Sequence, residues 1–182
     1  MKKIFLISIS TIIFPAMLFG QTKWQQTSGS VTFKIKNRGS DVDGHFGSLK
    51  TALVFSPDKL ASSSLKGWVD AGSINTDNGK RDKDLQGETY FDAGKFKTIE
   101  VSSTKLTKKG AQYSGTFNVT MKGVSKQMEI PFSFTQKGNE AEFRANFSIN
   151  RRDYGVGGKS GLAMFMGDDA NVTIDIKAKK GK

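Results

Sequence analysis

The chain has 182 residues and a formal net charge of +11, with no cysteine and a single histidine. This length predicts one domain, and the lack of cysteine excludes disulfides, thiolate metal sites and a lipoprotein anchor. The basic residues are scattered and alternate with apolar ones, which favours the solvated face of a sheet over a patch that binds nucleic acid.

The start of the chain has the order of a secretory signal peptide. Lys2 and Lys3 precede an apolar run, and the small Gly20 follows that run. A basic start, a short apolar run and a small residue are the signature of a cleaved export signal. We therefore expect residues 1–20 to be removed and the domain 21–182 to be periplasmic or secreted. A retained N-terminal anchor is the alternative.

Most of the remaining chain alternates between apolar and polar residues, a period of two that is typical of strands with one buried face. Val31, Phe33 and Ile35 form the first such set. Seven similar stretches follow near residues 49–55, 65–69, 99–103, 113–119, 128–134, 143–149 and 172–176. About eight strands with polar turns between them predict an all-β antiparallel sandwich or barrel.

Three features interrupt this pattern. The segment from Thr76 to Gln86 is polar and does not alternate, so we expect a short inserted helix there, capped by Thr76, at one end of a barrel. A second short turn is expected between Phe91 and Phe96. Pro131 falls inside a predicted strand and lacks an N–H for the ladder, which indicates a bulge or a sheet edge.

The sequence offers little for catalysis or for a cofactor. His45 is the only histidine, so a metal site would depend almost entirely on carboxylates, and a serine nucleophile would have one candidate base. Gly158-Lys159-Ser160 lacks the earlier glycine of a phosphate-binding loop, because Asp153 stands in its place. We expect no metal, no cofactor and no enzymatic activity.

Aromatic residues fall on the apolar side of the predicted strands. The candidate residues for an apolar channel are Phe33, Phe55, Tyr113, Phe117, Phe132, Phe134, Phe143 and Phe147. An eight-stranded barrel has an interior just wide enough for side chains or one small ligand, so these rings either fill the barrel or line a cavity. The small inward residues Gly67, Gly115 and Ala145 favour a cavity, because they leave room beside the rings.

Short motifs also occur along the whole domain in a fixed order. They are Val31–Ile35, Gly39, Gly44-His45-Phe46, Phe55–Asp58, Ser73–Thr76, Arg81-Asp82, Leu85, Tyr90-Phe91-Asp92, Ser102-Ser103, Gly115, Met121–Lys126, Asn150-Arg151 and Asp153-Tyr154-Gly155. As an ordered set they resemble the YceI-like family of periplasmic polyisoprenoid-binding proteins, over nearly all of residues 21–182.

The resemblance implies a lipocalin-like barrel with a short helix near its mouth. It also implies a polyprenyl chain or a quinone tail held along the barrel axis for transport, storage or sequestration. The chain departs from the family at Asn37 and Asp84, where many members have histidine, and at Lys97, where many have proline. These departures alter the polar rim, for which the candidate residues are Asn37, His45, Arg81, Asp82, Asp84 and Arg151. Among them, Arg81 and Asp82 are expected to form a charged pair.

Two other functions remain open. An exported stress-response or scaffold barrel would fill its interior with its own side chains and bind no ligand. An enzyme that acts on a lipid would use His45 with a nearby carboxylate. The lysines near the C-terminus, Lys177, Lys179, Lys180 and Lys182, allow weak contact with anionic headgroups. The sequence predicts no oligomeric state.

Overall fold

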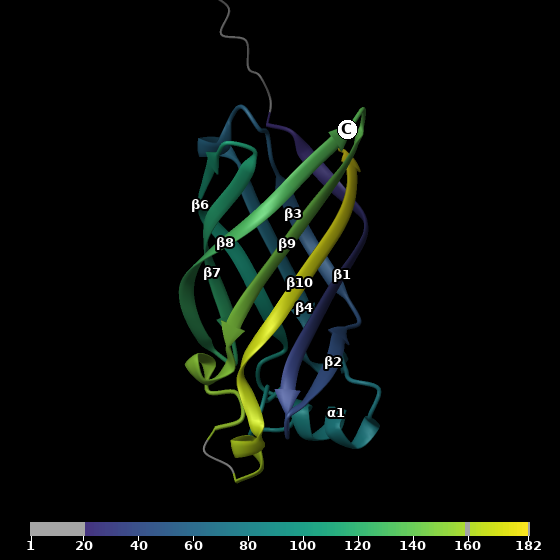
Figure 1. The fold of residues 1–182 in the computed structure, drawn as a ribbon. Coiled ribbons are helices and arrows are strands. Elements are labelled where there is room, and N and C mark those ends of the chain that lie inside the picture. Colours follow the sequence, from purple (N-terminus) through teal and green to yellow (C-terminus); the bar gives the residue numbers. More distant parts are fainter. Residues whose placement is uncertain (1–20, 159–160, 182) are drawn as a thin grey trace, which may run out of the picture.

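The computed structural model describes residues 21–158 and 161–181, so the predicted signal peptide lies outside the described residues. The described chain forms a closed antiparallel β-barrel with one short α-helix (Figure 1). Its strands are β1 (Lys23–Asn37), β2 (Ser40–Phe46), β3 (Leu49–Val54), β4 (Ser64–Asp70), β5 (Ile74–Asn75), β6 (Thr98–Lys109), β7 (Gln112–Met121), β8 (Val124–Lys137), β9 (Glu140–Asn150) and β10 (Met166–Lys180). The all-β barrel predicted from the alternation is confirmed.

The first and last strands close the barrel. β1 pairs with β10 over nearly its whole length, from Trp24 opposite Lys180 to Asn37 opposite Met166. β2 and β3 act as one interrupted strand, because β2 pairs with the second half of β1 and β3 pairs with its start. β4 and β5 are interrupted in the same way and pair with β3 and β2. The strand segments therefore make an eight-stranded barrel, as expected.

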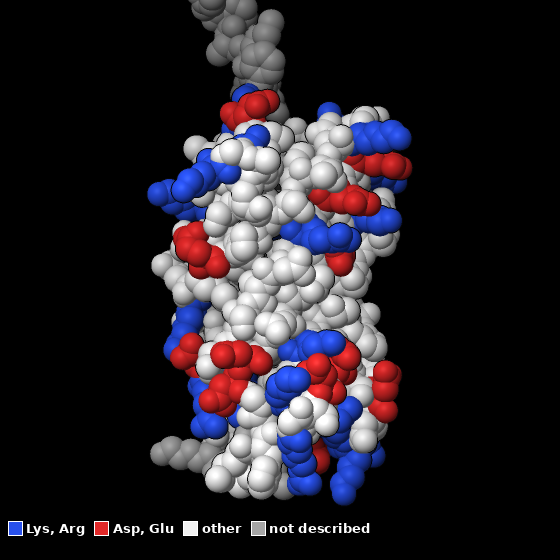
Figure 2. Space-filling model, in the orientation of Figure 1, with Lys and Arg blue, Asp and Glu red and all other residues white. Residues whose placement is uncertain are grey.

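Side chains alternate between the interior and the surface along each strand. In β7, every second residue from Tyr113 to Met121 is buried. The scattered lysines lie on the outer face, where Lys34 pairs with Asp43 and other lysines make similar pairs (Figure 2). Exposed ion pairs of this kind contribute only about 0–1 kcal/mol each. The basic residues of the strands thus form a solvated outer face, as the sequence indicated.

One end of the barrel, here called the mouth end, carries α1 and most of the other non-strand elements (Figure 1). Helix α1 (Gly79–Gln86) lies there, as do the 3-10 helices η3 (Arg151–Tyr154) and η4 (Gly161–Phe165), which follow β9 and precede β10. The opposite end, here called the closed end, has the start of β1, the 3-10 helix η1 (Leu60–Ser62) and the end of β10. The helix predicted near the barrel mouth is confirmed.

The cap of α1 differs from the prediction. Asn78 is the N-cap residue, and its side-chain oxygen accepts a hydrogen bond of 3.0 Å from the backbone N–H of Arg81. This N–H is three residues on, as expected for an N-cap. The prediction that Thr76 caps the helix is wrong, because its hydroxyl binds the side chains of Arg81 and Asp82 instead. The turn expected between Phe91 and Phe96 is present.

The ladder between β8 and β9 stops at Pro131. It runs from Lys137 opposite Glu140 to Phe132 opposite Ala145 and extends no further toward the mouth end. On its other side, β8 stays paired with β7 in regular register through Pro131. Proline has no N–H to donate and is found at sheet edges. The edge expected at Pro131 is therefore confirmed on the side that faces β9.

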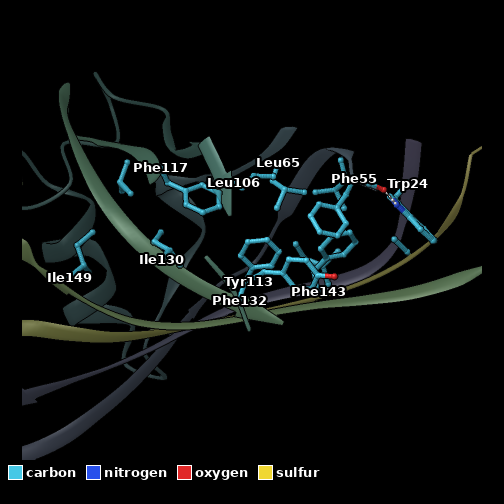
Figure 3. Packing of buried hydrophobic residues seen from close by; sticks show 14 of the residues in the cluster. Trp24, Phe55, Leu65, Leu106, Tyr113, Phe117, Ile130, Phe132, Phe143 and Ile149 are labelled. Atoms are coloured by element: carbon cyan, nitrogen blue, oxygen red, sulfur yellow. Dashed lines mark hydrogen bonds between the residues drawn. The ribbon is translucent and has the colours of Figure 1, made fainter. Parts of the chain in front are cut away.

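The closed end is filled by aromatic rings (Figure 3). Phe55 lies at the centre and is 0% exposed, and the centroids of four neighbouring rings lie between 4.7 Å and 5.8 Å from its own. The indole N–H of Trp24 donates a hydrogen bond of 2.9 Å to the carbonyl oxygen of Phe55. Edge-on and tilted contacts between rings are the favoured geometries. This aromatic cluster consists of Trp24, Phe55, Tyr113, Phe132, Phe134 and Phe143.

The space beside Gly115 is also filled. A Cβ atom at this position would lie 2.6 Å from Cε2 of Phe117 and 2.7 Å from Cδ2 of Leu106. The expectation that Gly115 leaves room in the interior is therefore wrong, since side chains of its own strand and of β6 occupy that room. Gly67 and Ala145, in contrast, do border empty space, which belongs to the cavity described next.

Candidate functional site

The half of the barrel toward the mouth end is hollow. It holds a cavity of about 210 Å³, lined by residues of all ten strands. Phe132 and Phe143 belong both to this lining and to the aromatic cluster, so the cluster forms the floor of the cavity. Along β10 the lining runs from Met166 to Ile176. This stretch spans about 25 Å of the barrel axis for a rise of ~3.4 Å per residue and a tilt of ~40°.

The wall of the cavity has empty space beside it. Phe33, Phe147 and Val172 point into the barrel, yet each is only half-buried, whereas Phe55 in the aromatic cluster is fully buried. Such partial exposure of inward-facing side chains means that unfilled space lies beside them in the barrel interior. A long and narrow volume with an apolar wall suits one extended apolar chain better than a compact polar ligand.

The ring of Phe33 lies over the glycine opposite it on the neighbouring strand. Phe33 in β1 pairs with Gly44 in β2, and a Cβ atom on Gly44 would lie 2.3 Å from Cζ of the ring. The ring of Phe46 lies 5.8 Å from that of Phe33 and 6.0 Å from that of Phe91, in the loop after α1. These contacts extend the aromatic surface from the barrel wall to the loop that follows α1.

Arg81 brings a positive charge to the lining. Its Nε donates to the hydroxyl of Thr76 at 2.7 Å, and its Nη2 donates to the carbonyl oxygen of Thr76 at 2.6 Å. The Thr76 hydroxyl in turn donates to the carboxylate of Asp82 at 2.6 Å. The direct charged pair expected between Arg81 and Asp82 is therefore not formed, because Thr76 stands between them. Nη1 of Arg81 makes no hydrogen bond within residues 21–158 and 161–181.

Arg151 lines the cavity as well, but it is fixed by the chain itself. It is only 4% exposed and donates to the carbonyl oxygens of Val156, Met166 and Gly167 and to the carboxylate of Asp168. Burial lowers the pKa of the guanidinium, and the carboxylate of Asp168 opposes that shift. Arg151 thus ties η3 to the start of β10 and sets the shape of the mouth.

A comparison with protein-family models identifies the family of this barrel. The model of the YceI-like domain matches residues 23–178, which is nearly the whole span from the start of β1 to the end of β10. The chain belongs to the YceI-like family. The resemblance inferred from the ordered motifs is therefore confirmed.

YceI-like relatives are known by sequence. A UPF0312 protein of Yersinia pestis (strain Pestoides F) is 29% identical over 133 residues, which is 69% of each chain. A UPF0312 protein of Yersinia enterocolitica is 27% identical over 133 residues, again 69% of each chain. Both relatives thus share about two thirds of their length with this YceI-like chain.

Solved structures share its fold. BcnA of Burkholderia cenocepacia has a TM-score of 0.78 at 22% identity, over 83% of this chain and 96% of that one. A Campylobacter jejuni YceI protein has a TM-score of 0.70 at 24% identity, over 79% and 87% of the two chains. A polyisoprenoid binding domain from Saccharophagus degradans, implicated in plant cell wall breakdown, has a TM-score of 0.68 at 11% identity, over 88% and 99%. At these identities the likeness shows the barrel.

The eight aromatic residues predicted to line a channel in this YceI-like barrel separate into two groups. Five of them line the cavity: Phe33, Phe117, Phe132, Phe143 and Phe147. The other three lie within the aromatic cluster and do not border the cavity: Phe55, Tyr113 and Phe134. Sequence alternation identified the inward face of each strand, but it did not show how far along the axis each ring lies.

The predicted rim residues also fall into two groups, those that line the cavity and those that do not. Asn37, Arg81 and Arg151 line the cavity, whereas Asp82 is bound to Thr76 and does not line it. His45 and Asp84 are exposed and lie outside the lining. The outward position of His45 follows from strand alternation, since its neighbour Phe46 points inward.

Several lining residues lie in segments where strand periodicity carries no signal. Leu85, Phe91 and Val156 line the mouth half from α1 and from the connecting segments. Leu85 could have been found, because it is the one apolar residue of the helix sequence GKRDKDLQ and is buried. Trp24 of the aromatic cluster was also missed, since β1 begins several residues before the alternation becomes clear.

Two general features complete the description. Within residues 21–158 and 161–181, no three His, Cys, Asp or Glu side chains are placed to hold a metal ion. In the same part of the chain, no helix has the length and hydropathy needed to cross a membrane.

Proposed function

We propose that this protein binds one long apolar lipid, of the polyisoprenoid or isoprenoid-quinone type, inside the barrel. The observation that carries the proposal is the narrow cavity of about 210 Å³, with its apolar wall and its aromatic floor. The tail enters first, because the floor is formed by packed rings and the polar lining residues Asn37, Thr76, Arg81 and Arg151 lie toward the mouth. Transport, storage or sequestration in the cell envelope follows as the role.

Burial of the tail supplies the binding energy. About 0.8 kcal/mol is gained per buried CH₂ group, so about 15 carbons give roughly 12 kcal/mol before any costs. Ordering a flexible tail offsets a sizeable part of that gain. The apolar wall has nothing with which to hydrogen-bond the tail, so the barrel selects by length and shape.

Arg81 is the group best placed to contact a polar headgroup. It lines the cavity, Thr76 holds its guanidinium in place, and Nη1 is not engaged by the described chain. Arg151 is less suited to this role, because main-chain carbonyl groups occupy its donors. We assign Arg81 to orient the headgroup and Arg151 to shape the mouth.

The comparison with the Saccharophagus degradans polyisoprenoid binding domain supports a lipid ligand, since that domain shares the barrel. A scaffold barrel filled by its own side chains accounts for the closed end but not for the half-buried wall of Phe33 and Phe147. An enzyme based on His45 is disfavoured, because that histidine lies outside the cavity lining. The basic and apolar start of the chain supports export and a periplasmic or secreted location.

A pair of substitutions tests the proposal. Ala145 lines the cavity, so Ala145→Phe should block it, while Ser148→Phe adds the same ring at an exposed position of the same strand. The measurement is the rise in melting temperature when a purified long-chain polyprenol is added in detergent, since a ligand of the folded state stabilises it. The unaltered protein and Ser148→Phe should show the rise and Ala145→Phe should not. An equal rise in all three would show that the lipid binds elsewhere.

A further inference from the structure

The exposed large apolar side chains gather at one end of the barrel. In the described part of the chain they are Val124, Met164 and Phe165, with exposed fractions of 37%, 74% and 56%. Val124 begins β8 at the mouth end, and Met164 and Phe165 end η4 at the same end. Single exposed apolar residues are ordinary, but two adjacent ones at the rim of an open cavity require an explanation.

Met164 and Phe165 lie directly beside the cavity wall. The next residue, Met166, lines the cavity. The carbonyl oxygen of Phe165 accepts a hydrogen bond of 2.8 Å from the backbone N–H of Arg38, and Arg38 follows Asn37, another lining residue. The exposed pair is thus held to the β1–β2 turn, at the edge of the opening through which a ligand must pass.

Positive charge accompanies this apolar pair. The guanidinium carbon of Arg38 lies 5.3 Å from the centroid of the Phe165 ring. Arg38 is exposed, as are Lys80 and Lys83 of α1, and none of the three forms a salt bridge within the described residues. Figure 2 shows uncharged surface at the mouth end next to Lys and Arg side chains. Aromatic and apolar groups flanked by cations are typical of segments that lie in the interface of an anionic bilayer.

We propose that Met164 and Phe165 form a membrane-docking tip. The tip inserts its two side chains into the headgroup region of an anionic phospholipid bilayer, and Arg38 contacts the phosphates. This contact holds the mouth against the membrane. Its purpose rests on the proposed lipid-binding function, since a long apolar lipid is delivered from or to a bilayer, but the docking itself is measured separately.

The closed end also carries positive charge, which predicts the opposite orientation on a membrane if charge alone decides it. It carries Lys177, Lys179 and Lys180 but none of the exposed large apolar residues of the described chain. If charge alone governed membrane contact, the closed end would face the bilayer. Docking through the tip places the mouth there instead, so two sets of variants distinguish the two orientations.

Cosedimentation with vesicles tests the tip. The vesicles contain phosphatidylcholine alone or phosphatidylcholine with phosphatidylglycerol, and the protein is residues 21–182. Met164→Ser combined with Phe165→Ser should lower partitioning onto the anionic vesicles by at least about tenfold, since both apolar contacts are lost. Arg38→Gln should weaken binding to the anionic vesicles and leave the weak binding to phosphatidylcholine unchanged. The matched control, Lys179→Gln with Lys180→Gln, should change partitioning by less than about twofold.

Three results would overturn the docking tip. The first is equal partitioning of the tip variant and the unaltered protein. The second is a larger loss in the control variant, which would show that the closed end faces the membrane. The third is a dimer of the free protein that the tip variant dissociates, as sedimentation would reveal, because a second copy would then cover the tip.

The detergent-based melting measurement tests lipid binding independently of membrane docking, because it involves no bilayer. The tip variant should keep the full rise in melting temperature with added polyprenol, because its two residues are not assigned to the cavity. Docking without any such rise, even in the unaltered protein, would support the tip and refute the proposed ligand. Loss of both properties in the tip variant alone would contradict a role confined to docking.

Discussion

The ring centroid of Phe134 lies 4.7 Å from that of Phe55, and this contact lies in the filled part of the barrel. Phe55 is fully buried at the centre of the aromatic cluster, which closes the barrel toward the end of β10. Beyond the cluster the same kind of strand, with the same alternation, surrounds an open cavity. One barrel therefore has a core at one end and a candidate binding site at the other.

Truncation of one ring in each half should have different effects. Phe55→Ala removes the centre of the aromatic cluster and should lower the free energy of unfolding by about 3–5 kcal/mol. Phe147→Ala should cost less than about half of that in the lipid-free protein, because empty space already lies beside this half-buried ring. Urea unfolding monitored by circular dichroism measures both values. Equal losses at the two positions would indicate that the barrel is filled throughout.

The glycine under Phe33 should be needed for the shape of the cavity. Gly44→Ala places a methyl group 2.3 Å from the ring, so Phe33 must shift into the cavity. We expect a loss of about 1–3 kcal/mol in stability together with weaker lipid binding. Gly47→Ala is the control, since its Cβ would meet its nearest neighbour, Cβ of Ser73, at an ordinary 3.5 Å. If Gly44→Ala behaved like Gly47→Ala in both measurements, the contact with Phe33 would not shape the cavity.

The buried arginine should matter for stability more than its exposed neighbour. Arg151→Met leaves the carbonyl groups of Val156, Met166 and Gly167 without this donor and should cost about 1–3 kcal/mol. Arg151→Lys should restore only part of the loss, because an ammonium group lacks the planar fork of donors. Arg152→Met should cost at most about 1 kcal/mol, since Arg152 is exposed. The reverse order of losses would refute the structural role of Arg151.

The headgroup role of Arg81 predicts a selective effect. Arg81→Ala should weaken binding of a lipid with an anionic headgroup by about ten- to a hundredfold, as expected for the loss of a charge-assisted hydrogen bond of ~1.5–3 kcal/mol. Binding of a bare hydrocarbon of equal length should change little. Lys80→Ala is the matched control, because Lys80 is exposed and lies outside the cavity lining. Titration followed by tryptophan fluorescence measures the affinity of the unaltered protein and of both variants for each ligand. A similar loss for both ligands in Arg81→Ala would remove Arg81 from the headgroup site.

Much of the fold was predictable because a period of two reports which face of a strand is buried. The barrel, its approximate number of strands and the inserted helix all followed from that pattern. The position of each side chain along the barrel axis did not follow from the pattern, because it depends on which residues of distant strands lie at the same level. Phe55 and Phe147 have the same alternation, yet one fills the core and the other borders the cavity.

The same limit applies to empty space and to the rim. Gly115 looked like a source of room, but Leu106 from the neighbouring strand occupies it. Arg81 and Asp82 looked like a charged pair, but adjacent residues on a helix point in different directions, and Thr76 links them instead. The loop residues of the mouth have no periodicity, so only the structure shows that Phe91, for example, lines the cavity.

Organic extraction followed by mass spectrometry tests most directly whether the barrel holds a lipid. The protein is purified from its native host without detergent, and its melting temperature is measured before and after extraction. We predict one class of long-chain apolar lipid at about one molecule per protein, and a lower melting temperature once it is removed. An extract without such a lipid, together with an unchanged melting temperature when polyprenol is added back, would show that the barrel does not bind a long apolar lipid.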